Sequence, residues 1–390
     1  MLKPRQDAIL KIFLEDPAKP RAVSDFGDFE VDRTTLFRDL QELSKLKILL
    51  PSDATRARTY ALNPKSEPYI EWDLTRPPYE RPAVKYDPKI LGSYRPNKTF
   101  LLSDDQRKRM AAAGNISELP PEAASGKNYE RLLASLLIDL AHASSSLEGI
   151  AISWLDTKTL IEFGEMPRGL DEKQIRIVLN HKSAISHIVE HGKDMSLGRQ
   201  DLFDIHRLLT EGLLADRSSI GALRSRVVRF DDSKYLPPDN PHQLKEIFEE
   251  FCSKAKDIED PYEQAFFAMS FLPYIQPFED GNKRTFRLAM NIPLIRQKLA
   301  PFSFSDIKKR DYMFGLLAVY EKGNFDFLAR AFASAYELTA KRYSDMIDYV
   351  REGGILSTVS EQKRPEKSSS DQSDSSLPKI PRKRDRGMSR

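Results

Sequence analysis

The sequence contains one cysteine and no long apolar run. Cys252 alone cannot form a disulfide within the chain or supply a thiolate metal cluster, so we expect a reducing, cytoplasmic environment. The most apolar helix-like stretch, residues 132–140, is too short to cross a membrane and includes the charged Asp139. The first residues lead into an amphipathic segment without the apolar centre of a signal peptide. We therefore expect no association with a membrane.

The net charge is also small, at +3 over 390 residues. Residues 361–390 hold nine Lys or Arg against five Asp or Glu, which accounts for the whole positive surplus. The rest of the chain is close to neutral. Its overall charge therefore does not indicate nucleic-acid binding.

The patterns that are present predict a mainly α protein with several parts. A length of 390 residues is enough for two or three domains. Residues 1–63 are predicted to form a winged helix-turn-helix, in which Ile9 and Phe13 share one helix face and Asp32 caps a second helix. Two short strands separated by a polar turn are predicted at residues 48–50 and 59–62.

In that fold, the second helix and the wing present side chains suited to phosphate and base contacts. They are Arg33, Thr34, Thr35, Arg38, Arg56 and Arg58. Residues 1–62, however, contain eleven Lys or Arg and ten Asp or Glu, and so lack the basic field that DNA binders use. DNA binding and a dimerisation or docking role both remain open for this segment.

The remaining parts differ in composition. Residues 64–127 are rich in proline and tyrosine and are expected to be an ordered arm that buries groups such as Ile70 and Tyr79 on the next domain. Residues 128–340 form one helix-rich block. Residues 357–390 form a basic, Ser-rich tail that is expected to be disordered.

The most informative stretch is residues 276–287, Gln-Pro-Phe-Glu-Asp-Gly-Asn-Lys-Arg-Thr-Phe-Arg. It is predicted to be a turn that leads into a helix continuing to Lys298. A glycine-bearing loop at a helix N-terminus directs backbone N–H groups at one centre and binds anions. Arg284 and Arg287 add guanidinium groups for phosphate, and Asp280 offers a hard oxygen ligand for Mg²⁺. Together these groups predict a polyphosphate nucleotide site.

This stretch resembles the signature of the Fic (Fido) family, His-Pro-Phe-x-(Asp/Glu)-Gly-Asn-(Gly/Lys)-Arg-x-x-Arg. Every fixed position matches except the first, where Gln276 replaces histidine. Residues 144–149 resemble the family's inhibitory motif, (Ser/Thr)-x-x-x-Glu-Gly, through Ser144, Glu148 and Gly149. Other landmarks of the resemblance, which covers about residues 80–340, are Asn180-His181 ahead of a helix and Gly221-Ala222-Leu223-Arg224.

The resemblance implies a function. Members of the family mostly transfer AMP from ATP onto a Ser, Thr or Tyr hydroxyl of another protein, and often dimerise. Asp280 would then hold Mg²⁺, and Arg287 would meet either the γ-phosphate or the inhibitory carboxylate of Glu148. The nucleotide-binding residues implied are Gly281, Asn282, Lys283, Arg284 and Arg287.

The resemblance also implies a flap that aligns a target protein by strand addition. We expect this flap to be a hairpin over residues 227–235. The residues that would dock the target are Val227, Val228, Arg229, Phe230 and Tyr235.

Gln276 weakens the expected catalysis. In the family the histidine accepts the proton of the attacking hydroxyl, whereas a glutamine amide has no useful proton affinity at neutral pH. Losing a general base costs roughly 10²–10⁴ in rate. None of the six histidines lies in the loop, and His142, six residues before Glu148, is more simply explained by helix packing.

Three functions therefore follow from the sequence. The first is a Mg-ATP-binding Fic protein, autoinhibited by Glu148 and impaired as an AMP transferase by Gln276. The second is a non-catalytic regulator that responds to nucleotide and uses its winged helix on DNA or a partner. The third is a phosphotransferase, because Lys283-Arg284-Thr285 resembles the death-on-curing branch of the family.

Overall fold

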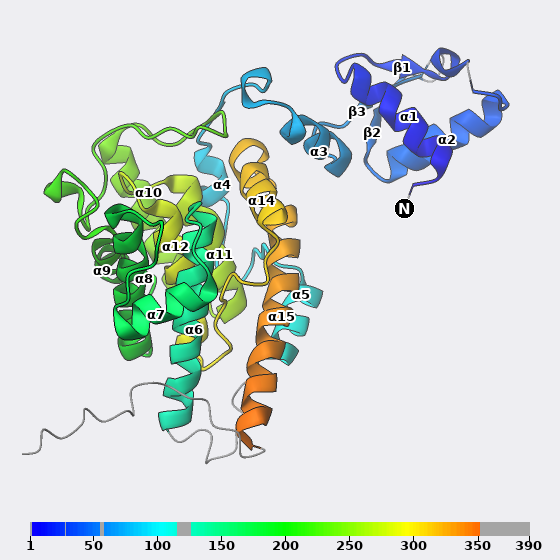
Figure 1. The fold of residues 1–390 in the computed structure, drawn as a ribbon. Helices are drawn as coiled ribbons and strands as arrows, with labels where there is room; N and C mark the ends of the chain where they lie inside the picture. Colours follow the sequence, from blue (N-terminus) through cyan, green and yellow to red (C-terminus); the bar gives the residue numbers. More distant parts are fainter. Residues whose placement is uncertain (1, 28, 55–57, 115–125, 352–390) are drawn as a thin grey trace, which may run out of the picture. The chain divides into compact units, whose positions relative to one another are not determined.

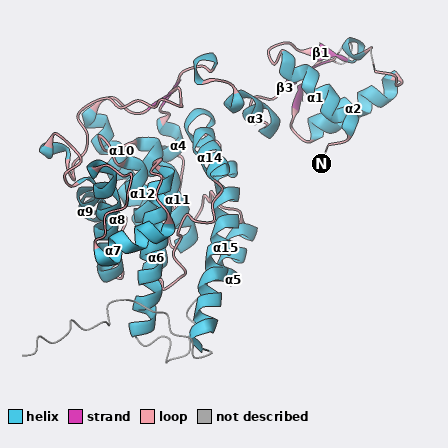
Figure 2. Cartoon of the chain, in the orientation of Figure 1, coloured by secondary structure: helices cyan, strands magenta, loops and turns pink. Residues whose placement is uncertain are grey.

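The computed structural model describes residues 2–27, 29–54, 58–114 and 126–351, and the described chain is mainly helical, as expected (Figures 1 and 2). No described helix is both long enough and apolar enough to pass through a membrane. The first elements are α1 (Pro4–Glu15), β1 (Arg21–Ala22), η1 (Val23–Phe26), α2 (Arg33–Lys45), β2 (Leu49–Pro51) and β3 (Thr59–Leu62).

These first elements share a small hydrophobic core of their own. Ile9 and Phe13 of α1 pack there with Leu40 of α2, and all three are fully buried. Asp32 caps α2 by accepting a 2.8 Å hydrogen bond from the Thr35 N–H. The strands pair antiparallel in the order β1-β3-β2. The two predicted strands correspond to β2 and β3, whereas β1 was not predicted. The winged-helix assignment remains a prediction.

The arm contains short elements: α3 (Glu67–Thr75), η2 (Pro78–Glu80), β4 (Val84–Lys85), α4 (Pro88–Gly92) and α5 (Asp104–Gly114). Ile70 is buried as expected, whereas Tyr79 is 76% exposed and does not pack. Tyr94 donates a 3.1 Å hydrogen bond from its hydroxyl to Glu263, and the Leu101 and Leu102 N–H groups donate to the same carboxylate. The arm is thereby fixed to the helical block.

The helical block surrounds one fully internal helix. Its elements are α6 (Gly126–Leu147), α7 (Trp154–Phe163), α8 (Glu172–His191), α9 (Arg199–Thr210), η3 (Arg217–Ser219), β5 (Tyr235–Leu236), α10 (Pro241–Asp257), α11 (Pro261–Ile275), α12 (Asn282–Ala289), α13 (Ile292–Arg296), α14 (Lys309–Lys322) and α15 (Asp326–Arg351). Every residue of α11 after Pro261 is buried, because α10, α12, α13 and α14 all pack against it. Figure 1 shows α10 and α12 beside α11. The candidate loop follows directly from the end of this helix.

Two expectations about local structure are wrong. The helix expected to continue to Lys298 ends at Ala289 and resumes as α13, where Pro293 cannot donate a backbone hydrogen bond. Asn180-His181 does not precede a helix but lies within α8.

The hairpin expected over residues 227–235 is also wrong, since residues 227–234 form a loop without strand pairing. Strand β5 pairs instead, in parallel, with β4 of the arm. The Val84 N–H donates to the Lys234 carbonyl at 3.1 Å, and the Tyr86 N–H donates to the Leu236 carbonyl at 2.9 Å. The arm therefore occupies the edge with which a returning strand would pair.

Candidate functional site

The loop after α11 is closed by its own side chains. Gln276 ends the helix in the left-handed region, with φ of 51°, and its N–H donates to the Leu272 carbonyl at 3.0 Å. Asn282 spans the loop: its Oδ1 accepts from the Phe278 N–H at 2.9 Å, and its Nδ2 donates to the Phe278 carbonyl at 2.8 Å. The turn is therefore rigid before any ligand binds.

The loop leads into the N-terminus of α12. Gly281 has a φ of +76°, and a Cβ there would lie 2.9 Å from Cγ2 of Thr210, so this position requires glycine. Thr285 is the first residue whose N–H bonds back, to the Gly281 carbonyl at 2.9 Å. The N–H groups of Asn282, Lys283 and Arg284 have no backbone acceptor within the described chain. They form an electropositive helix end.

Two arginines of α12 face this helix end. Arg284 and Arg287 are almost fully buried. Arg284 Nη2 lies 3.2 Å from the Asp280 carboxylate, while its Nε is buried without a hydrogen-bond partner among the described residues. A buried guanidinium N–H without a partner is costly and favours an anionic ligand.

Glu148 lies against the same arginines. Its Oε1 is ion-paired with Nη2 of Arg287, and its Oε2 is 3.8 Å from Nε of Arg284. The residue follows α6, where Gly149 adopts a φ of +88° and ends the helix. Gly149 thus ends α6, and Glu148 meets Arg287 as the resemblance implies.

A series of hydrogen bonds also holds the Arg287 side chain. Its Nε donates to the Ser144 hydroxyl oxygen at 2.8 Å, and that hydroxyl lies 2.8 Å from Nε2 of His181. His181 Nδ1 is 2.8 Å from the Ile177 carbonyl, so Nδ1 carries the ring proton and Nε2 accepts from Ser144. Each donor in this series therefore has an acceptor.

The pKa values of His181 and Glu148 are both lowered in this site. Burial lowers the pKa of His181 to about 3, and the neighbouring Arg287 acts in the same sense, so the imidazole is neutral. Burial opposes ionisation of Glu148, but Arg287 and Arg284 outweigh it, and the net pKa of this carboxyl is lowered. The site therefore holds one carboxylate between two cations.

A second histidine lies beneath the loop. His206 Nδ1 accepts from the Gly221 N–H at 3.0 Å, and Nε2 lies 3.0 Å from the Asp280 carbonyl, to which it donates. The ring stacks on Phe278, with centroids 3.9 Å apart and planes inclined by 6°. Burial lowers the pKa of His206 to about 4, so the ring is neutral at physiological pH.

The segment before residues 227–234 is fastened to the loop. Arg224 Nε donates to the Gln276 carbonyl at 2.6 Å, and the Arg224 N–H donates to the Pro277 carbonyl at 3.0 Å. Glu279 accepts from the Ser219 hydroxyl at 2.6 Å and pairs with Arg226 at 2.9 Å. The loop and this segment form one hydrogen-bonded unit.

Comparison with known proteins identifies the central part of the chain. Residues 196–294, which include α9 and the whole loop, match the Fic/DOC family model. The chain contains a Fic domain.

Similarity to individual proteins extends beyond the Fic domain at low identity. The chain is 22% identical over 271 residues to the protein adenylyltransferase fic-1 of Caenorhabditis elegans, covering 67% of this chain and 52% of that protein. It is 28% identical over 174 residues to the protein adenylyltransferase Fic of Nematostella vectensis, covering 43% and 40%. The chain thus spans about half the length, or less, of these relatives.

A solved structure shares the fold. The chain superposes on a Fic family protein from Desulfovibrio desulfuricans with a TM-score of 0.50 and 18% identity, over 67% of this chain and 77% of that one. Identity at this level shows the arrangement of helices alone.

The residues at the start of α12 could hold an anionic ligand together with a magnesium ion. In the part of the chain that the structure describes, Arg284 Nε is a buried donor without a hydrogen-bond partner and the first N–H groups of α12 have no backbone acceptor. The Asp280 side chain is 62% exposed at the same end. No group of three or more His, Cys, Asp or Glu side chains that could hold a metal occurs among the described residues. One carboxylate suits Mg²⁺, which keeps waters and shares substrate phosphates. Asp280 would hold the ion, and the ion would offset phosphate charge.

Gln276 lies where the resemblance places the catalytic histidine, and its side-chain amide already donates one hydrogen bond to the backbone of α11. The residue is 6% exposed, and its Nε2 donates to the Pro273 carbonyl at 2.8 Å. The side-chain amide oxygen of Gln276 is then the atom that could accept from a hydroxyl. This oxygen can orient a hydroxyl but cannot remove its proton at neutral pH.

The predicted target-docking residues differ in their exposure. Val227 and Arg229 are exposed, Val228 and Phe230 are half-buried, and Tyr235 is buried and donates to the Tyr274 carbonyl at 2.8 Å. Only the outer part of this segment is therefore free to meet a target.

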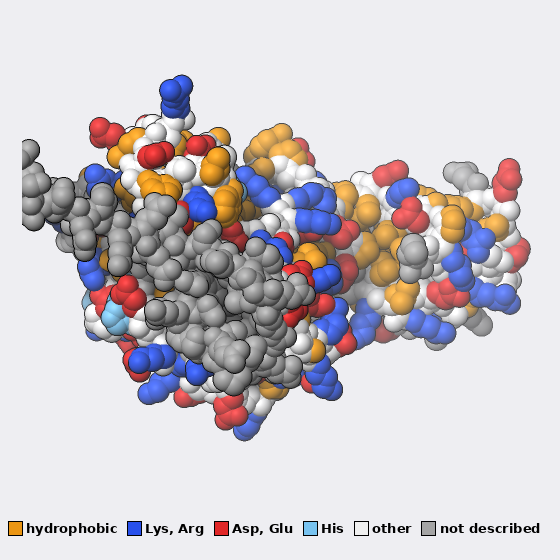
Figure 3. All heavy atoms as spheres, turned by 60° about the horizontal axis from the view of Figure 1, so that its bottom comes forward, with side chains coloured by type: hydrophobic (Ala, Val, Ile, Leu, Met, Phe, Trp, Pro, Cys, Tyr) orange, Lys and Arg blue, Asp and Glu red, His pale blue; other side chains and the backbone are white. Residues whose placement is uncertain are grey.

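On α2, Arg33, Thr34 and Arg38 are exposed, and the Thr35 hydroxyl donates to Asp32. Arg58 is half-buried. Arg56 and residues 357–390 lie outside the described residues. On the face drawn in Figure 3, basic and acidic side chains are interspersed, without a field of one sign.

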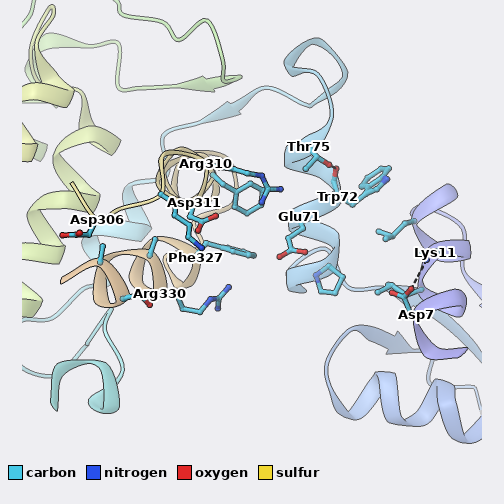
Figure 4. A pocket seen from close by; sticks show the side chains of 18 of the residues that line it. Asp7, Lys11, Glu71, Trp72, Thr75, Asp306, Arg310, Asp311, Phe327 and Arg330 are labelled. Atoms are coloured by element: carbon cyan, nitrogen blue, oxygen red, sulfur yellow. Dashed lines mark hydrogen bonds and ion pairs between the residues drawn. The ribbon is translucent and has the colours of Figure 1, made fainter. Parts of the chain in front are cut away.

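A pocket of about 800 Å³ occurs elsewhere in the chain. Figure 4 shows side chains that line it, among them Arg310, Asp311 and Arg330 from α14 and α15. None of the residues 276–287 belongs to its lining. This pocket is thus separate from the candidate site.

Sequence reasoning missed the roles of His206, Arg224 and Glu279. All three act through contacts with residues more than fifty positions away. The one signal for Arg224 was its place in the Gly221–Arg224 landmark, and His206 had no local signal.

Proposed function

We propose that this chain binds Mg-ATP at the N-terminus of α12 and descends from enzymes that transfer AMP to a Ser, Thr or Tyr hydroxyl of a target protein. The observation that carries the proposal is the placement of Glu148. Its carboxylate is ion-paired with Arg287 and faces Arg284 at an anion-binding helix end. An acidic side chain in that position imitates a bound phosphate.

The proposed autoinhibition follows from this imitation. Arg287 is 1% exposed, so its charge needs a partner, and Glu148 supplies one in the absence of nucleotide. ATP would have to displace the carboxylate before its γ-phosphate reached Arg287. Glu148 therefore lowers nucleotide affinity or holds ATP in an unproductive pose.

The proposed AMP transfer lacks a general base at the position of Gln276. In AMP transfer, the hydroxyl oxygen forms a bond to the α-phosphorus, the bond to the bridging oxygen breaks, and pyrophosphate leaves. The hydroxyl proton must go to a base, and Gln276 cannot take it. Positioning and stabilisation of phosphate charge by Arg284 and the α12 N–H groups remain. We therefore expect weak or no transfer.

The proposed target site is the exposed outer part of the segment before β5. Ser225, Val227 and Arg229 are exposed, and the ends of the segment are held by Arg224 and by β4. A target strand could add its backbone to this segment, next to the loop. The target is a protein, in keeping with the names of the similar adenylyltransferases.

Labelled ATP tests this function. The purified chain, its Glu148→Gly variant and the Glu148→Gly/Gln276→His variant are incubated with ATP labelled at the α- or γ-phosphate. We expect α-label on protein only in the double variant. Label in the single variant would show that Gln276 is tolerated. Transfer of γ-label would support the phosphotransferase function instead, and no label in any variant would contradict the AMP-transferase origin.

A second candidate function rests on the N-terminal elements. Arg33, Thr34 and Arg38 project from the surface of α2, which has its own core and cap. We propose that this surface binds DNA or a partner and that nucleotide in the Fic domain regulates it. A DNA footprint that weakens in Arg33→Ala/Arg38→Ala, with a smaller dependence on salt, would support DNA binding. Its absence would leave a protein partner as the occupant.

A further inference from the structure

We propose that His206 is a positioning residue that holds the backbone of Asp280 and the start of the target-docking segment, residues 221–234, in one geometry. This inference rests on the proposed function, since it assigns Asp280 to the magnesium ion. Its evidence is independent of any ligand. It consists of two hydrogen bonds, one stacking contact and two restricted glycines.

The two hydrogen bonds use both ring nitrogens. Nδ1 has the Gly221 N–H as its donor, which requires Nδ1 to be the unprotonated acceptor. Nε2 then carries the proton and donates it to the Asp280 carbonyl. A neutral imidazole with one defined tautomer satisfies both partners at 3.0 Å. No other uncharged side chain offers a donor and an acceptor on opposite sides of a flat ring.

The ring position is fixed on its faces as well. His206 is fully buried and lies parallel to Phe278, two residues before Asp280. Gly281 follows Asp280, and a Cβ built on it would lie 3.5 Å from Cδ2 of His206. Asp280 thus lies between Phe278, which stacks on the ring, and Gly281, where an added side chain would reach the ring.

The same ring restrains the start of the target-docking segment. Gly221 has a φ of +65°, and a Cβ there would lie 3.1 Å from the Phe203 carbonyl oxygen and 3.2 Å from Cβ of Arg207. The backbone therefore approaches α9 closely at the point where its N–H meets Nδ1. Arg224 follows three residues later and bonds to the loop itself. His206 consequently links the predicted metal ligand to the predicted docking segment.

Three substitutions separate these contacts. His206→Gln keeps an amide N–H near Nε2 and loses the acceptor for Gly221. His206→Asn keeps an oxygen near Nδ1 and loses the donor for Asp280. His206→Phe keeps the stacked ring and loses both hydrogen bonds. His242→Gln, at an exposed position of α10, is the matched control.

Each substitution is made in Glu148→Gly protein and measured in two ways. Calorimetry gives the affinity for ADP with Mg²⁺ and with EDTA, and amide exchange gives the protection of the Gly221 N–H without nucleotide. We expect His206→Phe and His206→Asn to reduce the gain in ADP affinity from Mg²⁺ by about three- to tenfold, the usual effect of one lost hydrogen bond. His206→Gln should restore most of that gain.

Amide exchange should show the opposite pattern. The Gly221 N–H should lose protection in His206→Phe and His206→Gln and keep it in His206→Asn. If His206→Phe does not fold, the Asn and Gln variants still make the contrast. Unchanged magnesium dependence and unchanged Gly221 protection in all variants would overturn the proposal.

The design also separates this inference from the proposed function. If the Glu148→Gly parent binds no ADP, the proposed function fails, and the assignment of Asp280 to magnesium fails with it. Gly221 protection then decides the remaining claim alone. Equal protection in the Gln and Asn variants would contradict it.

Discussion

Glu148 and Arg287, 139 positions apart, form an ion pair in which the arginine is buried and the glutamate side chain is 24% exposed. The asymmetry matters because the buried partner cannot be left alone cheaply, whereas the more exposed one can rotate into water. We therefore expect the ion pair to break by movement of the Glu148 side chain into solvent, while Arg287 stays in place.

The first prediction concerns this pair. Glu148→Ala should lower the free energy of unfolding by about 3 kcal/mol, because the Arg287 charge would remain buried with Ser144 as its nearest acceptor. Adding Arg287→Met should cost less than the sum of the two single changes. Urea denaturation of the single and double variants measures both. Glu165→Ala, at an exposed loop position, serves as the control. Strict additivity would contradict the pairing.

The second prediction concerns Gly281. Gly281→Ala places a methyl group at a positive φ and 2.9 Å from Thr210, whereas Gly164→Ala meets the same kind of φ, +73°, in open space. The Gly164 change should cost about 1 kcal/mol from backbone strain alone. The Gly281 change should cost more and should also weaken nucleotide binding. Equal thermal stabilities for the two variants would contradict the predicted clash between the added methyl group and Thr210.

The third prediction concerns pH. The folded-state pKa of His181, about 3, lies below its ordinary 6.5, so the unfolded chain binds more protons between these values. The contribution of His181 to stability is therefore complete above about pH 6.5 and is lost as the pH falls toward 3. Between pH 7 and pH 5 the chain should lose about 2 kcal/mol through this residue, at about 1.4 kcal/mol per unit. Denaturation of His181→Gln should show a flatter pH profile, and His187→Gln, on the same helix, should not.

The fourth prediction concerns the end of the docking segment. Glu321 accepts from Arg81 at 2.7 Å and from the Ser233 hydroxyl at 2.6 Å, and both charged side chains are buried. Glu321→Gln should cost about 3 kcal/mol, because it leaves the Arg81 charge buried and unpaired. Glu67→Gln breaks an exposed pair with Arg330 and should cost about 0–1 kcal/mol. Similar losses in the two variants would count against the anchoring role of Glu321.

The features that sequence predicted correctly are local. The Asp32 cap, the turn at Gly281 and the two strands before Leu62 depend on residues a few positions apart, and side-chain type decides them. The mainly helical fold followed from such patterns and from the Fic resemblance.

The features that sequence missed depend on distant partners. The expected hairpin failed because β4, about 150 positions earlier, takes the edge of β5, and no pattern within residues 227–235 records that competition. Arg81 and Glu321 are 240 positions apart, and neither residue type is expected inside a core. No local pattern distinguishes His206 from the other five histidines. Its role depends on the fold, which brings Asp280 and Gly221 to its ring.

The most direct measurement is titration calorimetry of the Glu148→Gly chain with Mg-ATP, beside the unchanged chain and the Glu148→Gly/Arg284→Ala variant. We predict clear binding heat in Glu148→Gly, much weaker binding in the unchanged chain, and loss of binding when Arg284 is replaced. An absence of heat from Mg-ATP in folded Glu148→Gly protein would contradict the claim that the N-terminus of α12 binds a triphosphate.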